Sequence, residues 1–214
     1  MTNIIHKWIL ENLSQTPTII EAGVCDGLDT EFFAKSFPNG KIYGFEPIPE
    51  LFQQSLDRNK NYSNVNLEQL ALGEMTEEKD FYVSDRFGKN WGSSSILKPK
   101  KHIDVHTEIT FNSKSTLKVV NLDEWCLDKG IDLVELMWLD MQGLEPIVIK
   151  NSPNIVSKTK FIYSEVSLIE TYENVVLYED FKSYMESINF KVVFEDLPWE
   201  DMGNVLFENI TKRI

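Results

Sequence analysis

The stretch Thr18-Ile19-Ile20-Glu21-Ala22-Gly23-Val24-Cys25-Asp26-Gly27 is a short apolar, β-branched run that leads into two glycines. Residues 29–37 then show helical spacing, and Pro38-Asn39-Gly40 is a typical helix stop. A strand that bends at glycine into a helix is the first unit of a parallel sheet with crossover helices. We therefore expect an α/β fold that begins with this stretch.

The same alternation of strand and helix patterns continues along the chain. Core strands are predicted at residues 41–46, 65–70, 133–139 and 161–166, with further strands at 79–83 and 116–121. Helices are predicted at residues 4–13 and 122–129, and also after Pro49, after Gly143 and around Phe181. The strands predicted at 190–194 and 204–207 have no helix between them, which indicates a hairpin at the sheet edge. The expected fold is a doubly wound, mostly parallel seven-stranded sheet with a C-terminal antiparallel hairpin strand.

The length of 214 residues favours a single domain, 1–214. Area scaling indicates burial of about seven-tenths of the unfolded surface, enough to fix an active site without disulfides. Residues 84–115 have weak periodicity, and a long irregular segment inside a compact domain is usually functional or mobile. We expect an irregular insertion that forms a candidate lid, in which Trp91-Gly92-Ser93-Ser94-Ser95 supplies an aromatic surface and hydroxyls. The alternative is an excursion without a role.

The net charge of −13 disfavours a nucleic-acid partner, because such a field repels phosphates. The single basic stretch, Lys98-Pro99-Lys100-Lys101-His102, is short. Cys25 and Cys126 show no metal-ligand spacing, and no disulfide framework is expected. The sequence has neither a signal-peptide pattern nor an apolar run of about 20 residues. We expect a cytoplasmic protein with no membrane span, and the sequence does not indicate its oligomeric state.

The first motif with chemical meaning is Glu21-x-Gly23-x-x-x-Gly27, at the end of the first strand. Glycines let a backbone approach a ligand closely, and a helix N-terminus offers free N–H groups. The spacing differs from the G-x-G-x-x-G of dinucleotide binders. A pyrophosphate would be repelled by Glu21 and Asp26, whereas a cationic sulfonium with an amino-acid tail would be attracted. The alternative is a tight turn in which the glycines are only conformational.

Two further acids follow predicted strands. Glu46 ends the second strand, 25 residues beyond Glu21, where a carboxylate can accept hydrogen bonds from both ribose hydroxyls. Asp140 directly follows the strand at 133–139 and is expected at the same edge of the sheet. It could orient a cofactor, bind substrate or act as a base. The alternatives are a solvated strand end for Glu46 and a helix N-cap for Asp140.

Several short motifs together resemble those of FkbM-type methyltransferases, in the same order along the chain. They are Glu21-Ala-Gly-Val-Cys-Asp-Gly27, Phe45-Glu-Pro-Ile-Pro49, Ala71-Leu-Gly73, Asn121-Leu-Asp-Glu-Trp125, Asp140-Met-Gln-Gly-Leu-Glu145, Glu165-Val166 and Gly203-Asn-Val-Leu-Phe207. The resemblance implies a Rossmann-like class I methyltransferase domain that binds S-adenosylmethionine and methylates a hydroxyl. It departs from the family pattern at Val24-Cys25-Asp26 and at Gln142, where many members have glutamate.

The resemblance also implies roles for individual residues. Glu21, Gly23 and Gly27 would hold the methionine part of the cofactor, Glu46 the ribose, and Ala71-Leu72 the adenine. Together with Asp26 and Asp140, these are the expected cofactor-binding residues. The acceptor is expected to be a small-molecule, sugar or lipid hydroxyl.

Transfer of a methyl group to a hydroxyl needs a proton acceptor within hydrogen-bond reach. We expect Asp140 and Glu165, both at strand ends, to be the catalytic residues, with His102 or His106 as a weaker candidate. No ligand spacing argues for a metal, so none is predicted, although Asp140 with a second acid or a histidine leaves that alternative open. Two rival functions also stay open: a nicotinamide-dependent oxidoreductase or epimerase on a similar sheet, and a non-catalytic scaffold.

Overall fold

A computed structural model describes residues 4–212 of the chain. Its centre is a seven-stranded sheet with the order β10-β11-β9-β8-β1-β2-β3. The strands are β1 (Thr18–Ala22), β2 (Lys41–Phe45), β3 (Val65–Glu68), β8 (Val134–Leu139), β9 (Thr159–Ser167), β10 (Phe190–Asp196) and β11 (Met202–Asn209). Strand β1 pairs in parallel with β2 and β8, and only β11 runs antiparallel to its neighbours β9 and β10. The predicted sheet, including its antiparallel hairpin strand, is confirmed.

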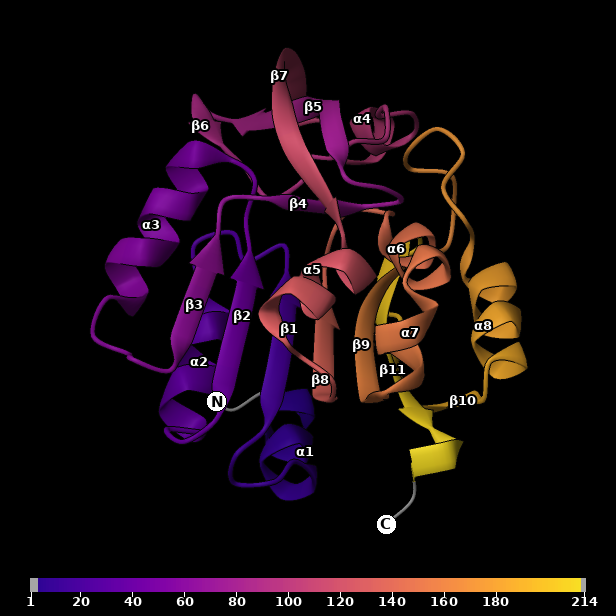
Figure 1. Cartoon of the computed structure of the whole chain (residues 1–214). Helices are drawn as coiled ribbons and strands as arrows, with labels where there is room; N and C mark the ends of the chain where they lie inside the picture. The colour runs from indigo at the N-terminus through magenta and orange to yellow at the C-terminus, as the bar shows by residue number, and fades with distance from the viewer. Residues whose placement is uncertain (1–3, 213–214) are drawn as a thin grey trace.

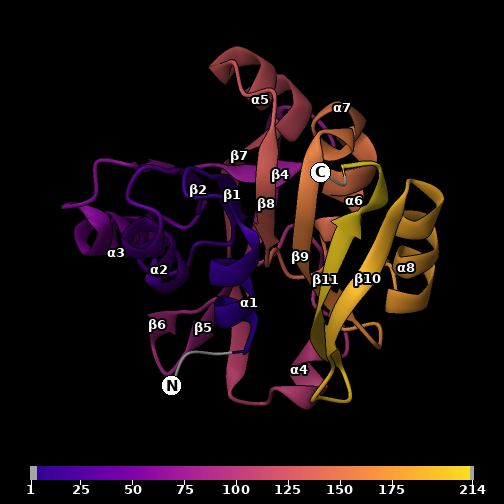
Figure 2. The ribbon, with the colours of Figure 1, turned by 90° about the horizontal axis from the view of Figure 1, so that it is seen from below.

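Helices cover both faces of this sheet (Figure 2). One face packs against α1 (Ile4–Asn12) and α2 (Leu28–Ser36), whose Ile5, Ile9 and Phe33 are buried against the sheet. The opposite face packs against α5 (Leu122–Lys129), α6 (Glu145–Asn151), α7 (Pro153–Ser157) and α8 (Tyr178–Ser187). Helix α3 (Pro49–Asn59) lies beside α2, with Pro49 at its first turn as expected for a helix start. The last described residues form a short 3₁₀ turn, Ile210–Lys212.

A second sheet with the order β4-β7-β5-β6 lies across the C-terminal ends of the core strands (Figure 1). Its strands are β4 (Ala71–Gly73), β5 (Glu77–Arg86), β6 (Lys89–Asn90) and β7 (Ile109–Asn121), and α4 (His102–Val105) lies between β6 and β7. The apolar side chains Ala71, Phe81, Val83 and Val119 pack against Ile48 and Leu51 beside α3. This sheet therefore lies over the edge where the core strands end.

Regular structure occupies more of residues 84–115 than the sequence indicates. The strand expected at 79–83 extends to Arg86, and the strand expected at 116–121 already begins at Ile109. The two strands pair over most of their length, although residues 78–80 of β5 and most side chains of β7 are exposed and polar. Because only a few positions on each strand are buried, the hydrophobic alternation that identifies a strand is weak here. Among the residues described, no helix is both long and apolar enough to cross a bilayer.

Candidate active site

The tips of β1, β2 and β8 converge on one bend of the backbone. The N–H of Gly23 donates to the carbonyl of Phe45 at 3.0 Å, and the N–H of Asp140 donates to that of Ala22 at 2.9 Å. Gly23 has φ +86°, and a Cβ there would lie 1.8 Å from the Asp140 carbonyl oxygen. Only glycine fits this close approach. The backbone bonds of the bend place Gly23, Glu46 and Asp140 at the same edge of the sheet.

A cavity of about 300 Å³ opens at this edge, at the lower end of the range for small-molecule sites. Backbone and apolar side chains form one wall, and the segment after β6 forms another. The lining comprises Ala22, Gly23, Cys25, Phe45, Glu46, Pro47, Ile48, Leu51, Leu70, Ala71, Leu72, Phe81, Trp91, Gly92, Ser93, Ser94, Asp140, Met141, Gln142 and Leu144. The mixture of two carboxylates with apolar walls suits a ligand that has both polar and flat apolar parts.

The Glu46 side chain is 4% exposed and is fixed by two backbone donors. Its Oε2 accepts from the N–H of Cys25 and its Oε1 from the N–H of Ile48, both at 2.8 Å. Each oxygen keeps a second lone pair for a ligand. Burial raises the pKa of Glu46 to about 7, and a ligand that donates hydrogen bonds to the ionised carboxylate would lower this pKa.

The expected cofactor residues divide into two groups. Gly23, Glu46, Ala71, Leu72 and Asp140 all line the cavity, whereas Glu21, Asp26 and Gly27 surround it without lining it. The Glu21 carboxylate is buried behind β1 and accepts from the Thr30 hydroxyl at 2.6 Å. Asp26 instead faces α3, where its Oδ2 is 3.1 Å from Nη2 of Arg58.

Gly27 begins α2 with φ +80°, and a Cβ there would lie 2.5 Å from the Asn59 side chain. It therefore allows α2 and α3 to pack closely. Gly27 therefore affects the cavity only indirectly, because it sets the position of α2.

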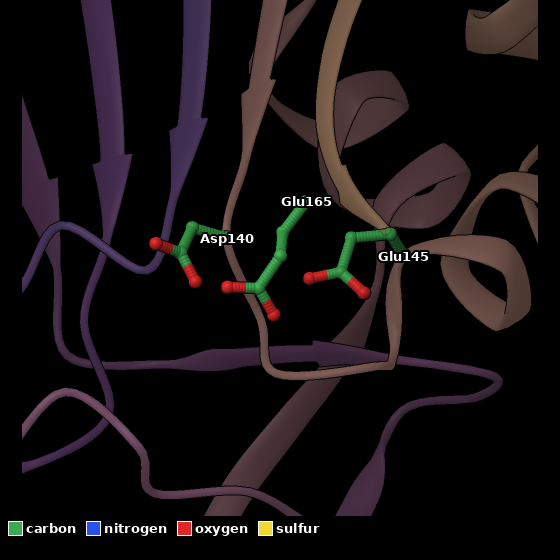
Figure 3. Close-up of side chains that lie close together, drawn as sticks. All are labelled: Asp140, Glu145 and Glu165. Carbon is green, nitrogen blue, oxygen red and sulfur yellow. The ribbon is translucent and has the colours of Figure 1, made fainter. Parts of the chain in front are cut away.

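Three carboxyl groups gather below the cavity, with Glu165 between Asp140 and Glu145 (Figure 3). One oxygen from each lies within 4.8 Å of the others. Asp140 follows β8 and faces the cavity, Glu165 lies near the end of β9 at 9% exposure, and Glu145 begins α6 at 1%. The N–H of Met141 donates to Glu145, and the Gln142 amide donates to Asp140 at 2.8 Å and to Glu165 at 3.1 Å.

The three acids of this cluster cannot all be ionised at neutral pH, because like charges this close repel each other. Burial raises the pKa of Glu145 to about 8. Burial and then the charges of Asp140 and Glu145 hold the pKa of Glu165 well above its usual range. Burial also raises the pKa of Asp140, opposed by hydrogen bonds from Gln142 and Glu165. Asp140 therefore carries the negative charge most readily, at the surface of the cavity.

Carboxylate oxygens in such a group are the ligands that a hard cation prefers. Here backbone and amide donors already contact an oxygen of each acid. We make no metal assignment, and the expectation of no metal stays a prediction.

Comparison with known proteins identifies the family. Residues 21–192 match the methyltransferase FkbM domain. The chain is 31% identical over 173 residues to the 2-O-methyltransferase NoeI of Sinorhizobium fredii, an alignment that covers 79% of this chain and 71% of that protein. The chain belongs to the FkbM methyltransferase family.

Solved structures support the fold of this FkbM methyltransferase at low sequence identity. The precorrin-6y C5,15-methyltransferase of Geobacter metallireducens matches with a TM-score of 0.53 and 11% identity, over 95% of this chain and 88% of that one. The fibrillarin of Aeropyrum pernix, solved with natively bound S-adenosyl-L-methionine, matches with a TM-score of 0.53 and 11% identity, over 91% and 68%. Both confirm the Rossmann-like methyltransferase architecture predicted from the sequence.

The structure also contains site residues of the FkbM methyltransferase that the sequence analysis missed. Ile48, Leu51 and Phe81 form the apolar wall, and Tyr172 contacts Gln142 below it. Each apolar residue looks like ordinary core in the sequence, and Tyr172 lies in a loop without periodicity. The stretch around Trp91-Gly92-Ser93 does reach the cavity, as its composition indicated.

The structure brings neither candidate histidine to the cavity of the FkbM methyltransferase. His102 is 1% exposed and packs beside Tyr172, with ring centroids 5.3 Å apart. His106 pairs with Asp201 at 2.8 Å. The lining residues therefore offer the carboxyl groups of Glu46 and Asp140, and not a histidine, as proton acceptors.

The buried Glu21 predicts an unusual pH dependence of stability. Burial raises its pKa from 4.5 to about 8 in the folded chain. Between these pH values the unfolded chain loses the proton while the folded chain keeps it, so stability falls as pH rises, by up to about 1.4 kcal/mol per pH unit. The change Glu21→Gln should make the protein more stable than wild type at about pH 8 and flatten this slope.

Urea unfolding between about pH 5 and pH 8 measures this effect. Glu46 and Glu145 contribute slopes of the same sign, so the variant should keep part of the pH dependence. The exposed Glu78 provides the control, because Glu78→Gln should reproduce the wild-type slope. An unchanged slope in Glu21→Gln would mean that Glu21 is ionised in the folded protein.

Proposed function

We propose that this FkbM methyltransferase uses S-adenosylmethionine to methylate a hydroxyl group of a small-molecule, sugar or lipid acceptor. One observation carries the proposal: Glu46 and Asp140 face a single cavity on either side of the Gly23 bend. This arrangement offers acceptors for ribose hydroxyls and an ionisable group for a proton within one small space.

The residues of the cavity fit the proposed cofactor. The free lone pairs of Glu46 would accept from the ribose hydroxyls, and the buried Ala71 and Leu72 with Phe81 provide an apolar wall for the adenine. The backbone at the Gly23 bend would hold the methionine part of the cofactor. Glu21, Asp26 and Gly27 support this bend from behind. S-adenosylmethionine would supply an activated methyl group on a cationic sulfur.

The acceptor would lie between Asp140 and the segment that contains Trp91, Ser93 and Ser94, the part of the candidate lid that reaches the cavity. Asp140 would take the proton of the acceptor hydroxyl as the new oxygen–carbon bond forms. Glu165 would act on Asp140 and not on the acceptor directly, because it lies beneath the lining and accepts from the same Gln142 amide as Asp140. Alignment of the acceptor with the methyl carbon would supply much of the rate.

The relatives support an oxygen acceptor and the cofactor. NoeI is named a 2-O-methyltransferase, and the Aeropyrum pernix fibrillarin contains S-adenosyl-L-methionine. The fibrillarin of Methanococcus jannaschii is a pre-rRNA processing protein, so this fold also occurs in proteins that act on RNA. For this chain we still propose a small-molecule acceptor, because its net charge of −13 would repel the phosphates of an RNA.

Thermal unfolding with different cofactors tests the proposal. S-adenosylhomocysteine at about 100 times its Kd should stabilise the protein by about 2.7 kcal/mol and raise the Tm by several degrees, whereas NAD should not. Stabilisation by NAD alone would favour the nicotinamide-dependent rival. No shift with either ligand would favour the non-catalytic scaffold, and a crystal soaked with S-adenosylhomocysteine would then show whether the cavity admits it.

A further inference from the structure

Gln142 is held in a strained backbone conformation that directs its side chain between two acids. Its φ is +56°, in the left-handed region that residues other than glycine seldom adopt. From there Nε2 donates to both Asp140 and Glu165, and the main-chain carbonyl accepts from the Ser95 hydroxyl at 3.1 Å. Because Nε2 donates to both acids, the amide is oriented with Oε1 directed away from them.

The remaining polar atom of Gln142 is held by Tyr172, which is 1% exposed. The Tyr172 hydroxyl lies 3.0 Å from Oε1 of Gln142 and 2.8 Å from the carbonyl of Ser93. Both of these atoms are acceptors, so the hydroxyl proton is shared between them. The tyrosine therefore joins the segment that lines the cavity to the amide that supports Asp140.

We propose that Tyr172 is a positioning residue, which acts through Gln142 to keep the Asp140 carboxylate oriented toward the cavity and in its ionised form. This inference rests on the proposed role of Asp140 as the proton acceptor. Among residues 4–212, Oε1 of Gln142 accepts no hydrogen bond other than that from Tyr172, so without the tyrosine hydroxyl the amide can turn away from Asp140. The loss of a donor to a carboxylate makes its ionised form less favourable.

Other ionisable groups also act on Asp140, and they set the background of the experiment. Around it lie Glu165 from β9, Glu145 from α6, Glu46 after β2, Asp29 from α2, Cys25 from the glycine bend, Tyr163 from β9 and Tyr172 itself. The change Tyr172→Phe alters none of the acids. It also keeps the ring that packs beside His102 and Phe111.

The test is a carboxyl-carbon NMR titration of protein labelled at aspartate, in which the Asp140 signal is identified by its absence from Asp140→Asn. In Tyr172→Phe the first ionisation seen at Asp140 should move to higher pH by about one half to one pH unit. The matched control is Tyr178→Phe, which removes the hydroxyl of another buried tyrosine, on α8 and away from the cavity, where it donates to Glu195. This control should leave the Asp140 titration unchanged.

A double-mutant cycle with Gln142→Ala decides whether the tyrosine acts through the amide. The Tyr172→Phe shift should disappear in the Gln142→Ala background. An unmoved Asp140 titration in Tyr172→Phe, an equal shift in Tyr178→Phe, or a shift that persists without Gln142 would each overturn the proposal. Binding of S-adenosylhomocysteine, measured on the same samples, reports separately on the proposed function, because the positioning role does not require the ligand.

Discussion

The change Asp140→Asn is expected to lower kcat by about 10²- to 10⁴-fold, the usual contribution of a general base. Asparagine has nearly the same shape and can still accept from the Gln142 amide, so the bend at Gly23 should keep its geometry. It cannot take a proton from the acceptor hydroxyl. The Kd for S-adenosylhomocysteine should therefore change by no more than about threefold, well under one step of 1.4 kcal/mol. Methyl transfer and calorimetric binding measured on the same preparation separate these two effects.

The other end of the same strand provides the control for Asp140→Asn. Asp132 lies before β8, where it pairs with Lys158 at 3.2 Å in a largely exposed position. Asp132→Asn should leave kcat and ligand binding unchanged, because exposed ion pairs contribute little. A kcat near the wild-type value in Asp140→Asn would remove Asp140 as the base. A large loss of ligand affinity would instead assign it to the cofactor.

The architecture could be predicted because the sequence repeats one local pattern. Runs such as Ile19-Ile20 and residues 136–139 are buried on both faces, and the helices between them bury apolar residues at helical spacing. The strand-end acids Glu46 and Asp140 could be predicted for the same reason, since the ends of parallel strands meet at one edge. The second sheet escaped prediction because residues 78–80 of β5 and most side chains of β7 are exposed.

The roles of the acids around the bend could be predicted only in part. Glu21 and Glu46 look alike in the sequence, yet Glu21 is directed to Thr30 behind the sheet while Glu46 reaches the cavity. Glu21 lies inside β1, opposite Gly44, whereas Glu46 lies two positions further on, beyond the last residue of β2, so only Glu46 reaches past the edge of the sheet. Glu145 and Tyr172 join the site through contacts between segments distant in the chain, which no local pattern records.

The change Glu46→Gln is expected to weaken binding of S-adenosylhomocysteine by about 10- to 100-fold, since hydrogen bonds to a charged group contribute about 1.5–3 kcal/mol. Without a ligand, burial raises the pKa of the Glu46 carboxyl to about 7. Its ionised form is the better acceptor for two hydroxyls. Wild-type affinity should therefore fall by up to about tenfold per pH unit below that value. In Glu46→Gln this part of the pH dependence should disappear.

The glutamine also places an amide where Cys25 and Ile48 each donate an N–H, so part of the loss in Glu46→Gln could come from a displaced loop. A ligand that lacks the ribose 2′-hydroxyl separates the two causes. If Glu46 holds the ribose, the 2′-deoxy analogue of S-adenosylhomocysteine should bind wild type less tightly, while the variant should hardly distinguish the two ligands. Equal discrimination by both proteins would place the ribose elsewhere. Glu46 would then serve only to fix the Cys25 and Ile48 backbone, and the cavity would need a different orientation of its ligand.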